Sequence, residues 1–325
     1  MITEIPTSSD FQNAGINLLN LAWDSAISLL IERDIDLNEI INENSVNETY
    51  WKSAQPILTS SLSLVQQGVE FFLKGKIAEV SPYLLIAGNP SSFPKNSYAR
   101  DTNFSDFRTI DAQDLIRMHD TVSSNRLPEG FSTWYDKLRK LRNKLMHTVD
   151  STITIKDKDV LIRVMECCEY CIQSLSWINV RSQYLMNSPS GYLIQNVPLE
   201  HLSDNEKMAY RLGQLQREIM TVVEYLEPQY SKKFLGFHKK QRSYVCLHCL
   251  SIRKRGVLFE YKDDEEIWLN INTAQLVESD VSQRNIVHCI FCGGNYLIKR
   301  EQCTECGNDI IDADTGRCLS CLIDT

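Results

Sequence analysis

Four cysteine pairs with CxxC spacing, all within the last 80 residues, constrain the fold of this chain more than any other feature. Two intervening residues let one tight turn aim two thiolates at the same ion, and two such turns supply the four sulfur ligands of tetrahedral zinc. The spacing therefore predicts two structural Zn²⁺ ions in a small β-rich zinc-ribbon domain, with no open ligand position for catalysis. The eight predicted ligands are Cys246, Cys249, Cys289, Cys292, Cys303, Cys306, Cys318 and Cys321.

The sequence leaves two ways of distributing these pairs between the ions. In sequential pairing the first two pairs hold one ion, and the last two hold the other around an eleven-residue loop. In the alternative, the second and third pairs join across the ten residues between them. Sequential pairing is favoured because consecutive segments are usually neighbours in space. His248 and His288 lie beside the pairs, and we interpret them as bystanders since the cysteines already complete both sites.

The other three cysteines, Cys167, Cys168 and Cys171, have no partner pair near them and are interpreted as buried structural thiols. Abundant cysteine would indicate disulfides in a small secreted chain, but the N-terminal MITEIPTSSD lacks a basic region followed by an apolar stretch. No uninterrupted apolar run reaches the roughly 18 residues that span a bilayer. We therefore expect a cytoplasmic protein with metal-binding thiols and no membrane partner.

The first 230 residues have helix-like apolar periodicity, few glycines and little β-branched alternation. They predict an all-α helical-bundle domain at 1–200, followed by a helical linker or stalk at 201–240 and the zinc-ribbon domain at 241–325. Ser8-Ser9-Asp10 and Ser203-Asp204 are the expected caps of the first and last helices. The expected helices cover residues 8–32, 47–76, 111–122, 131–149, 158–185 and 204–226.

A basic segment without acidic residues runs from just before the first cysteine pair to just after it. The net charge of −8 argues against wholesale coating of nucleic acid, so a local cationic patch stands out in this chain. Because Phe234, Phe237 and Tyr244 alternate with the cations, the segment is a candidate surface for phosphate contact and base stacking. A plain solvated charged face is the alternative. The candidate nucleic-acid-binding residues are Lys232, Lys233, Lys239, Lys240, Arg242, Arg253, Lys254 and Arg255.

The segment WYDKLRKLRNKLMHTV predicts a helix with one apolar stripe. At about 100° per residue, the stripe residues fall within about 60° of one another and should face the core. Asn143 and His147 point nearly away from the stripe and Arg142 lies on its flank, so this histidine is not expected in the core. Met146 and Tyr135 also lie off the stripe, which suggests a second apolar contact with a partner helix or a second copy. The stripe consists of Trp134, Leu138, Leu141 and Leu145.

On these residues the chain resembles the HEPN family, named for higher eukaryotes and prokaryotes nucleotide-binding. Catalytic members carry an arginine and, after a short spacer, a histidine on a late helix, often with a polar residue directly after the arginine. Arg142-Asn143-Lys144-Leu145-Met146-His147 matches that pattern. The likeness covers residues 45–185 and includes the apolar LVQQGVEFFLKG stretch with Glu70.

The resemblance implies a HEPN-like bundle acting as a metal-independent endoribonuclease, of toxin or phage-defence type, in a homodimer. His147 would move a proton at the ribose 2′-hydroxyl or the leaving 5′-oxygen, and Arg142 would hold the scissile phosphate. Asn143 would orient the phosphate or the histidine. The products would be a 2′,3′-cyclic phosphate and a 5′-hydroxyl. RNA and a second copy are the expected partners, with a regulatory protein as a further candidate.

One position departs from the family pattern. Some members carry a tyrosine two residues after the histidine, which a partner nucleotidyltransferase modifies, but this chain has Val149 there. Control by that route is not expected. The alternative interpretation of the whole chain is a non-catalytic dimeric module that binds nucleic acid or protein through its zinc ribbons. Other catalytic motifs such as GxSxG and HExxH are absent from the sequence.

Overall fold

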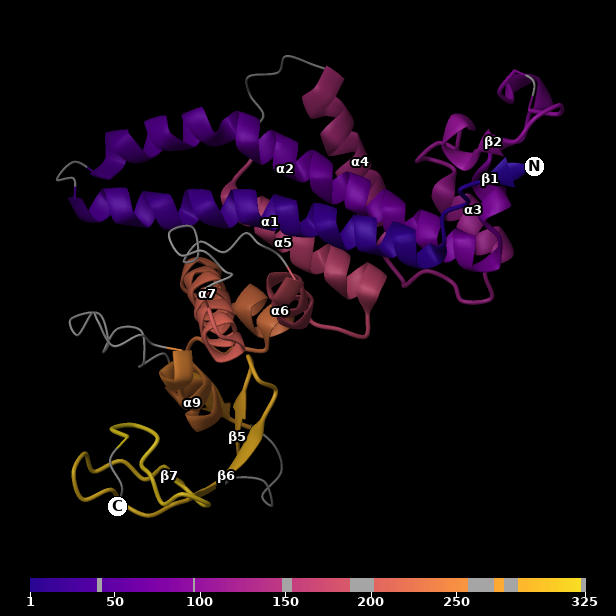
Figure 1. Cartoon of the computed structure of the whole chain (residues 1–325). Helices are drawn as coiled ribbons and strands as arrows, with labels where there is room; N and C mark the ends of the chain where they lie inside the picture. Colours follow the sequence, from indigo (N-terminus) through magenta and orange to yellow (C-terminus); the bar gives the residue numbers. More distant parts are fainter. Residues whose placement is uncertain are drawn as a thin grey trace. The chain divides into compact units, whose positions relative to one another are not determined.

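The computed structural model divides the chain into two compact units, Met1–Leu175 and Ser176–Thr325 (Figure 1). The described residues are 1–39, 43–95, 97–147, 154–187, 202–256, 272–277 and 286–322. Within these ranges the description leaves out the side chains of residues 34–39, 43–48, 147, 187 and 256.

The first unit is helical, as the sequence predicts. Its two longest helices, α1 and α2, run antiparallel and pack along each other (Figure 1). The third and fourth helices pack on α2, and the fifth packs on both long helices. The helices are α1 (Ser8–Glu39), α2 (Glu43–Val80), α3 (Leu115–Val122), α4 (Phe131–His147) and α5 (Asp157–Cys167). A short parallel pair, β1 (Ile2–Thr3) with β2 (Thr102–Asn103), and 3₁₀ turns at Pro82–Leu85, Pro90–Ser92 and Phe104–Asp106 complete the unit.

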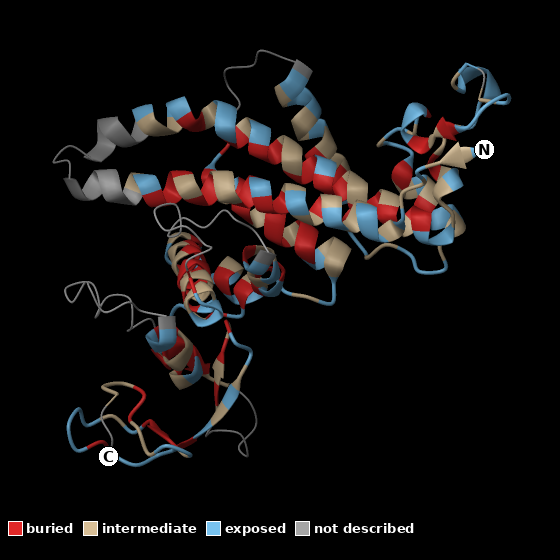
Figure 2. Cartoon of the chain, in the orientation of Figure 1, coloured by how far each residue is buried: buried red, intermediate tan, exposed pale blue. Residues whose placement is uncertain are grey.

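Many of the buried residues of the first unit lie on α1 and α2, and others lie on α4 and α5 (Figure 2). Burying apolar side chains at helical spacing removes them from water and is the main stabilising term. The indole of Trp134 on α4 donates a hydrogen bond to Glu166 Oε2 on α5 at 2.7 Å, which anchors α4. The side chains that are almost completely buried include Leu19, Trp23, Leu30, Leu58, Leu62, Leu73 and Ile77.

Two buried glycines let α1 and α2 approach closely. A Cβ built on Gly15 would lie 3.1 Å from the carbonyl oxygen of Gly68 and 3.1 Å from the ring of Phe72. A Cβ on Gly68 would lie 3.3 Å from the carbonyl oxygen of Gly15. The backbones therefore touch where a larger side chain would hold them apart.

We expect Gly15→Val to destabilise the protein by about 1–3 kcal/mol, because the branched side chain must push the α2 backbone away. The measurement is urea unfolding followed by circular dichroism. Gly88→Ala is the matched control, since a Cβ at Gly88 meets no heavy atom within 4 Å. Equal stability of Gly15→Val and the wild type would contradict the close contact.

By length and composition alone, helix α1 meets the criteria for a membrane-spanning helix. Its most apolar window, within Ser8–Arg33, has a mean hydropathy of 1.4, and 56% of that window is buried inside the protein. Leu19, Trp23 and Leu30 are among the buried residues and belong to the core. Packing against α2 accounts for the apolar composition of this helix.

The prediction of one helix over residues 158–185 is wrong. Helix α5 ends at Cys167, and a π-helical turn follows at Cys168–Ile172. Gln173 then has a positive φ of 52°, and its N–H donates to the carbonyl of Cys168 at 3.2 Å. A residue with positive φ cannot continue a right-handed helix, so the chain turns here.

The boundary between the units follows this turn. It lies between Leu175 and Ser176, so the next helix, α6 (Trp177–Asn187), belongs to the second unit. The sequence places these residues in the helical domain at 1–200, and residue 200 itself lies outside the described residues.

The second unit combines helices with a five-stranded sheet of order β3-β4-β5-β6-β7, in which every neighbouring pair is antiparallel. The β-rich structure predicted around the cysteines is confirmed, and it is an antiparallel sheet. The other helices are α7 (Asp204–Tyr225), α8 (Pro228–Tyr230) and α9 (Leu247–Gly256), with a π-helical turn at Ser231–Leu235. The strands are β3 (Ser243–Val245), β4 (Asn272–Leu276), β5 (Ile286–Cys289), β6 (Asn295–Lys299) and β7 (Ile311–Asp312).

Helix α7 begins where the sequence predicts. The backbone N–H of Ser203 donates to Glu206 Oε2 at 2.7 Å, and the N–H of Glu206 donates to Ser203 Oγ at 3.3 Å. This capping box satisfies two N–H groups that a helix start would leave unpaired. The sequence assigns this segment to a linker or stalk, and in the structure α7 packs against α6 and α9 within the second unit.

Candidate functional site

The eight predicted zinc ligands form two groups. The first tetracysteine group contains Cys246, Cys249, Cys289 and Cys292, and the second contains Cys303, Cys306, Cys318 and Cys321. Within each group all sulfur atoms lie within 4.8 Å of one another. This is the sequential pairing; the alternative of joining the second and third pairs is wrong.

The sulfur–sulfur distances match a tetrahedral zinc site. Zn–S bonds of about 2.3 Å place the sulfurs about 3.8 Å apart. The Sγ atoms of Cys246 and Cys292 are 3.7 Å apart, and those of Cys249 and Cys289 are 3.8 Å apart. In the second group the corresponding distances are 3.6 Å for Cys303 with Cys321 and 3.6 Å for Cys306 with Cys318. Four thiolates at these distances can hold one zinc ion in each group.

Three of the four pairs use one kind of turn. In each, the residue after the second cysteine has positive φ and donates its N–H to the carbonyl of the first cysteine, which closes a loop around the two thiolates. The donors are Gly293 (φ 65°), Gly307 (φ 71°) and Leu322 (φ 63°), and each hydrogen bond is 2.9 Å long. The first pair instead leads into α9: Cys246 directly precedes the helix, and Cys249 lies in its first turn.

Hydrogen bonds to sulfur also favour the thiolate form that zinc binds. The Nδ2 of Asn308 donates to Cys306 Sγ at 3.1 Å. The backbone N–H of Asn308 chiefly, and its side-chain amide in addition, lower the pKa of the Cys306 thiol to about 6. Tyr296 Oη and Thr273 Oγ1 lie 3.2 and 3.3 Å from Cys292 Sγ and Cys289 Sγ. Such contacts orient metal ligands and tune their basicity.

One predicted cation of the basic segment lies inside the second unit, and another contacts the end of α7. Arg253 is only 5% exposed, and its Nη1 donates to Gln216 Oε1 on α7 at 3.1 Å. Lys239 Nζ donates to the carbonyls of Glu224 and Leu226 at 2.7 and 2.9 Å, where α7 ends. A cation at this position satisfies the last carbonyls and the helix dipole.

The aromatic residues expected to stack on bases are mostly inside the second unit. Phe237 and Tyr244 are each only 5% exposed, so neither ring is available at the surface for stacking. Phe234 is half-buried and lies under Lys233, whose Nζ is 4.6 Å from the ring centroid. The exposed cations of the segment are Lys232, Lys233, Lys239, Lys240, Arg242, Lys254 and Arg255.

Arg142 and Asn143, two of the three predicted catalytic residues, lie together in the first unit. Arg142 Nη1 donates to Asn143 Oδ1 at 3.1 Å. Both line a polar cavity of about 220 Å³. The Nε of Arg142 is buried there and has no hydrogen-bond partner among the described residues. The cavity is lined by Gln66, Glu70, Asp111, Ala112, Gln113, Arg139, Arg142 and Asn143.

Neighbouring hydrogen bonds fix the walls of this cavity. Gln66 donates to Glu70 one turn along α2, and Tyr135 Oη donates to the carbonyl of Ala112 at 3.3 Å. Burial raises the pKa of Tyr135, and the negative charge of Glu70 raises it further, so the hydroxyl stays protonated. The loop before α3 is thereby held against α4.

The sequence missed most of this cavity. Arg139 lies three residues before Arg142 on the same helix, so their spacing alone predicts that both side chains lie on one face. Asp111 and Gln113 come from a loop, and only the tertiary fold brings them beside α4. The side chain of His147 lies outside the described part of the chain.

The described part of the first unit covers the C-terminal half of α4 only partly. Trp134 and Leu138 of the predicted stripe are buried, whereas Leu141 and Leu145 are half-buried. Met146 is 53% exposed. The described part of the first unit therefore leaves apolar surface beside Arg142.

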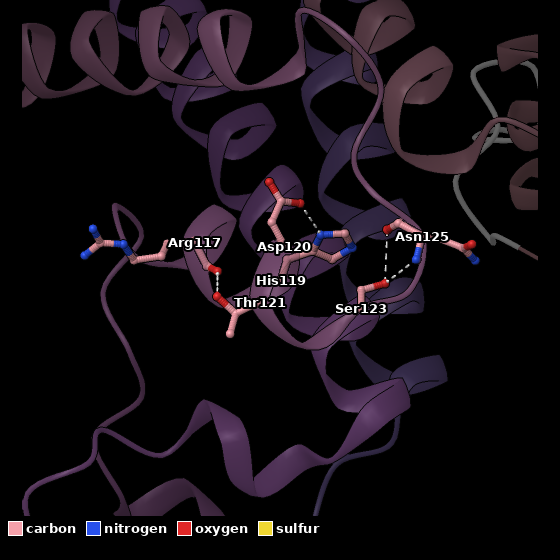
Figure 3. A network of polar contacts seen from close by, with 6 residues as sticks. All are labelled: Arg117, His119, Asp120, Thr121, Ser123 and Asn125. Atoms are coloured by element: carbon pink, nitrogen blue, oxygen red, sulfur yellow. Dashed lines mark hydrogen bonds and ion pairs between the residues drawn. The ribbon is translucent and has the colours of Figure 1, made fainter.

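His119 on α3 belongs to a different network (Figure 3). Its ring is almost completely buried, and Nδ1 lies 3.0 Å from Asp120 Oδ1. The N–H of Ser123 donates to the His119 carbonyl at 2.8 Å, and Ser123 Oγ contacts Asn125. These contacts cap the C-terminal end of α3, so we assign His119 a structural role.

Cys167 and Cys168 are buried, and Cys171 is half-buried. Cys167 Sγ lies 3.9 Å from Cys171 Sγ, and Cys168 Sγ donates to the carbonyl of Leu175 at 3.3 Å. Burial raises the pKa of Cys168 to about 12, so this thiol stays protonated. For Cys167 and Cys168 the interpretation as buried structural thiols is confirmed.

Comparison of the chain with protein families, with curated proteins and with solved structures found no match.

Proposed function

We propose that the protein is a metal-independent endoribonuclease effector, of toxin or phage-defence type, that cleaves RNA through the ribose 2′-hydroxyl. The helical unit would be HEPN-like and carry the chemistry. The second unit, with its two zinc-type tetracysteine groups, would bind the target or a partner.

The observation that carries this proposal is the polar cavity around Arg142. Several side chains with hydrogen-bond donors line this cavity of about 220 Å³. They are Gln66 on α2, Gln113 in the loop before α3, and Arg139, Arg142 and Asn143 on α4. Arg142 lines this cavity, so its guanidinium would bind a phosphate oxygen that enters the cavity. Desolvated arginine donors strongly stabilise the charge that grows on a phosphate in a transition state.

His147 would supply the acid–base chemistry. It is the last residue of α4, in the helix that carries Arg142 and Asn143. An imidazole with an unperturbed pKa of about 6.5 can move a proton at neutral pH. The 2′-oxygen would attack the phosphorus, the 5′-oxygen would leave with a proton, and a 2′,3′-cyclic phosphate would remain.

The proposed site needs a second copy. Arg142 and His147 lie about 140° apart around one helix, so a two-fold axis would bring the arginine of one chain towards the histidine of the other. The half-buried Leu141 and Leu145 and the exposed Met146 support a homodimer through α4, because this apolar surface lies beside the motif.

The test compares the purified full-length wild type with His147→Ala and Arg142→Ala on total RNA. We expect each substitution to reduce the cleavage rate by about 10²–10⁴-fold, as loss of an acid–base or charge-stabilising group does. Cleaved ends should carry 2′,3′-cyclic phosphate.

Lys137→Ala is the matched control, because Lys137 is an exposed cation of α4 that does not line the cavity. It should cleave like the wild type. Cleavage that is equal in His147→Ala and the wild type, or no cleavage by any of them, would rule out the catalytic assignment. The latter result would favour a non-catalytic binding module.

A further inference from the structure

A second, larger cavity lies in the second unit, where the loop after the π-helical turn meets β4 and β5. Its volume is about 380 Å³, within the range of small-molecule sites. None of its described lining residues is a zinc ligand. The cavity is lined by Lys232, Gly236, His238, Gln241, Gln275, Leu276, Val277, His288 and Ile290.

The lining divides into a basic part and an apolar part. Lys232, His238 and His288 offer nitrogen donors, and no carboxylate stands among the described lining residues. Leu276, Val277 and Ile290 supply the apolar part. With the amides of Gln241 and Gln275 also in the lining, a ligand that matches this surface carries an anionic group joined to an uncharged body with both polar and apolar surface.

The floor of the cavity is preformed. Gln275 is only 6% exposed, and its Oε1 accepts from the N–H of His238 at 2.8 Å. Its Nε2 donates to the carbonyls of His238 and Gln241 at 2.9 and 3.3 Å. Gln241 Nε2 in turn donates to the carbonyl of Leu276 at 2.7 Å. These bonds lock the loop onto β4, so binding costs little reorganisation.

The donors of the basic part are available to a ligand. Lys232 is exposed, and in the described part of the chain neither its Nζ nor the His238 ring has a hydrogen-bond or ion-pair partner. His288 Nδ1 is 2.9 Å from Asn295 Oδ1, which fixes the ring. Gly236 has a φ of 68°, and a Cβ built on it would meet no heavy atom within 4 Å. The cavity is therefore open on the side of Gly236.

We propose that this cavity binds a nucleoside monophosphate. Lys232 and His238 would hold the phosphate, and Leu276, Val277 and Ile290 would contact the sugar and base. The site lies in the second unit and shares no described lining residue with the Arg142 cavity, so it would regulate or direct the protein rather than take part in RNA cleavage.

Isothermal titration of the full-length, zinc-loaded chain with AMP, GMP, CMP and UMP tests this proposal. We expect saturable binding of at least one of them at one site per chain, with inorganic phosphate binding about tenfold or more weakly. Lys232→Gln and His238→Gln should each weaken binding by about tenfold, the effect of losing one hydrogen bond to a charged group.

Lys254→Gln is the matched control, because Lys254 is exposed but does not line the cavity. It should bind like the wild type, and all variants should keep their zinc content. Absence of binding by all four nucleotides, or equal binding by Lys232→Gln, His238→Gln and the wild type, would overturn the proposal. A 5′-phosphorylated RNA oligonucleotide that competes with the monophosphate would identify an RNA end as the source of the same chemistry. Arg142→Ala should retain binding, so the outcome is independent of the nuclease proposal.

Discussion

Cys249→Ser should leave one zinc ion per chain instead of two and unfold the sheet around the first tetracysteine group. Cys249 is 3% exposed, and its Sγ lies 3.8 Å from Cys289 Sγ, so serine would remove one of four buried ligands. Zinc binding contributes about 10–16 kcal/mol in small zinc domains, far more than typical packing contacts. This is the largest effect that we expect from any single substitution.

The structural reason is that the first tetracysteine group joins segments distant in sequence. It connects the start of α9, just after β3, to the turn between β5 and β6. The second group lies close by, since the N–H of Val245 on β3 donates to the carbonyl of Leu319 at 3.1 Å. Loss of the first ion should therefore also lower the affinity of the second.

Zinc content by mass spectrometry and thermal unfolding by circular dichroism measure this effect. Cys171→Ser is the matched control, because Cys171 belongs to neither group and is half-buried in the first unit. It should keep two ions per chain. Two ions in Cys249→Ser with an unchanged melting temperature would refute the structural role of the first site.

Arg181→Met should destabilise the second unit by about 3–5 kcal/mol, because it leaves a buried carboxylate without its cation. Arg181 Nε and Nη2 donate to Glu218 Oε2 and Oε1, each at 2.9 Å, and both side chains are almost completely buried. Gln214 Nε2 donates to Glu218 Oε1 at 2.9 Å. This two-point pair holds α6 against α7.

Urea unfolding of the full chain tests this prediction. Arg181→Met combined with Glu218→Leu should recover part of the loss, since removing both charges also removes the cost of burying one alone. Asp309→Asn is the matched control: Asp309 pairs with Arg300 at 3.1 Å, but it is 59% exposed, and exposed pairs contribute little. A small loss in Arg181→Met, similar to that of Asp309→Asn, would contradict the assigned role.

The features that the sequence predicted correctly depend on neighbours along the chain. A CxxC turn aims two thiolates whatever surrounds it, and the Ser203–Glu206 capping box forms within one helical turn. Apolar periodicity likewise marked α1 and α2, because helical spacing is a local property. Sequential pairing of the cysteines followed from the tendency of consecutive segments to be neighbours.

The errors concern features that packing decides. Arg253, Phe237 and Tyr244 look like surface residues in a basic segment, yet the fold buries all three. No proline or glycine marks the end of the helical segment after Cys168–Ile172. The chain turns there through the positive φ of Gln173, which the sequence does not indicate. Neither burial nor a backbone turn of this kind is encoded in residue spacing.

By itself, the sequence determined that this chain has a helical part and a part with two tetracysteine groups of zinc type, because cysteine spacing and apolar periodicity are properties of nearby residues. The sequence favoured one pairing of the cysteines but left two open; the tertiary structure decided between them and decided which cations stay exposed. It also placed Glu70, Asp111 and Arg139 around Arg142. These are contacts between segments far apart in the chain, and only the packing of the core brings such segments together.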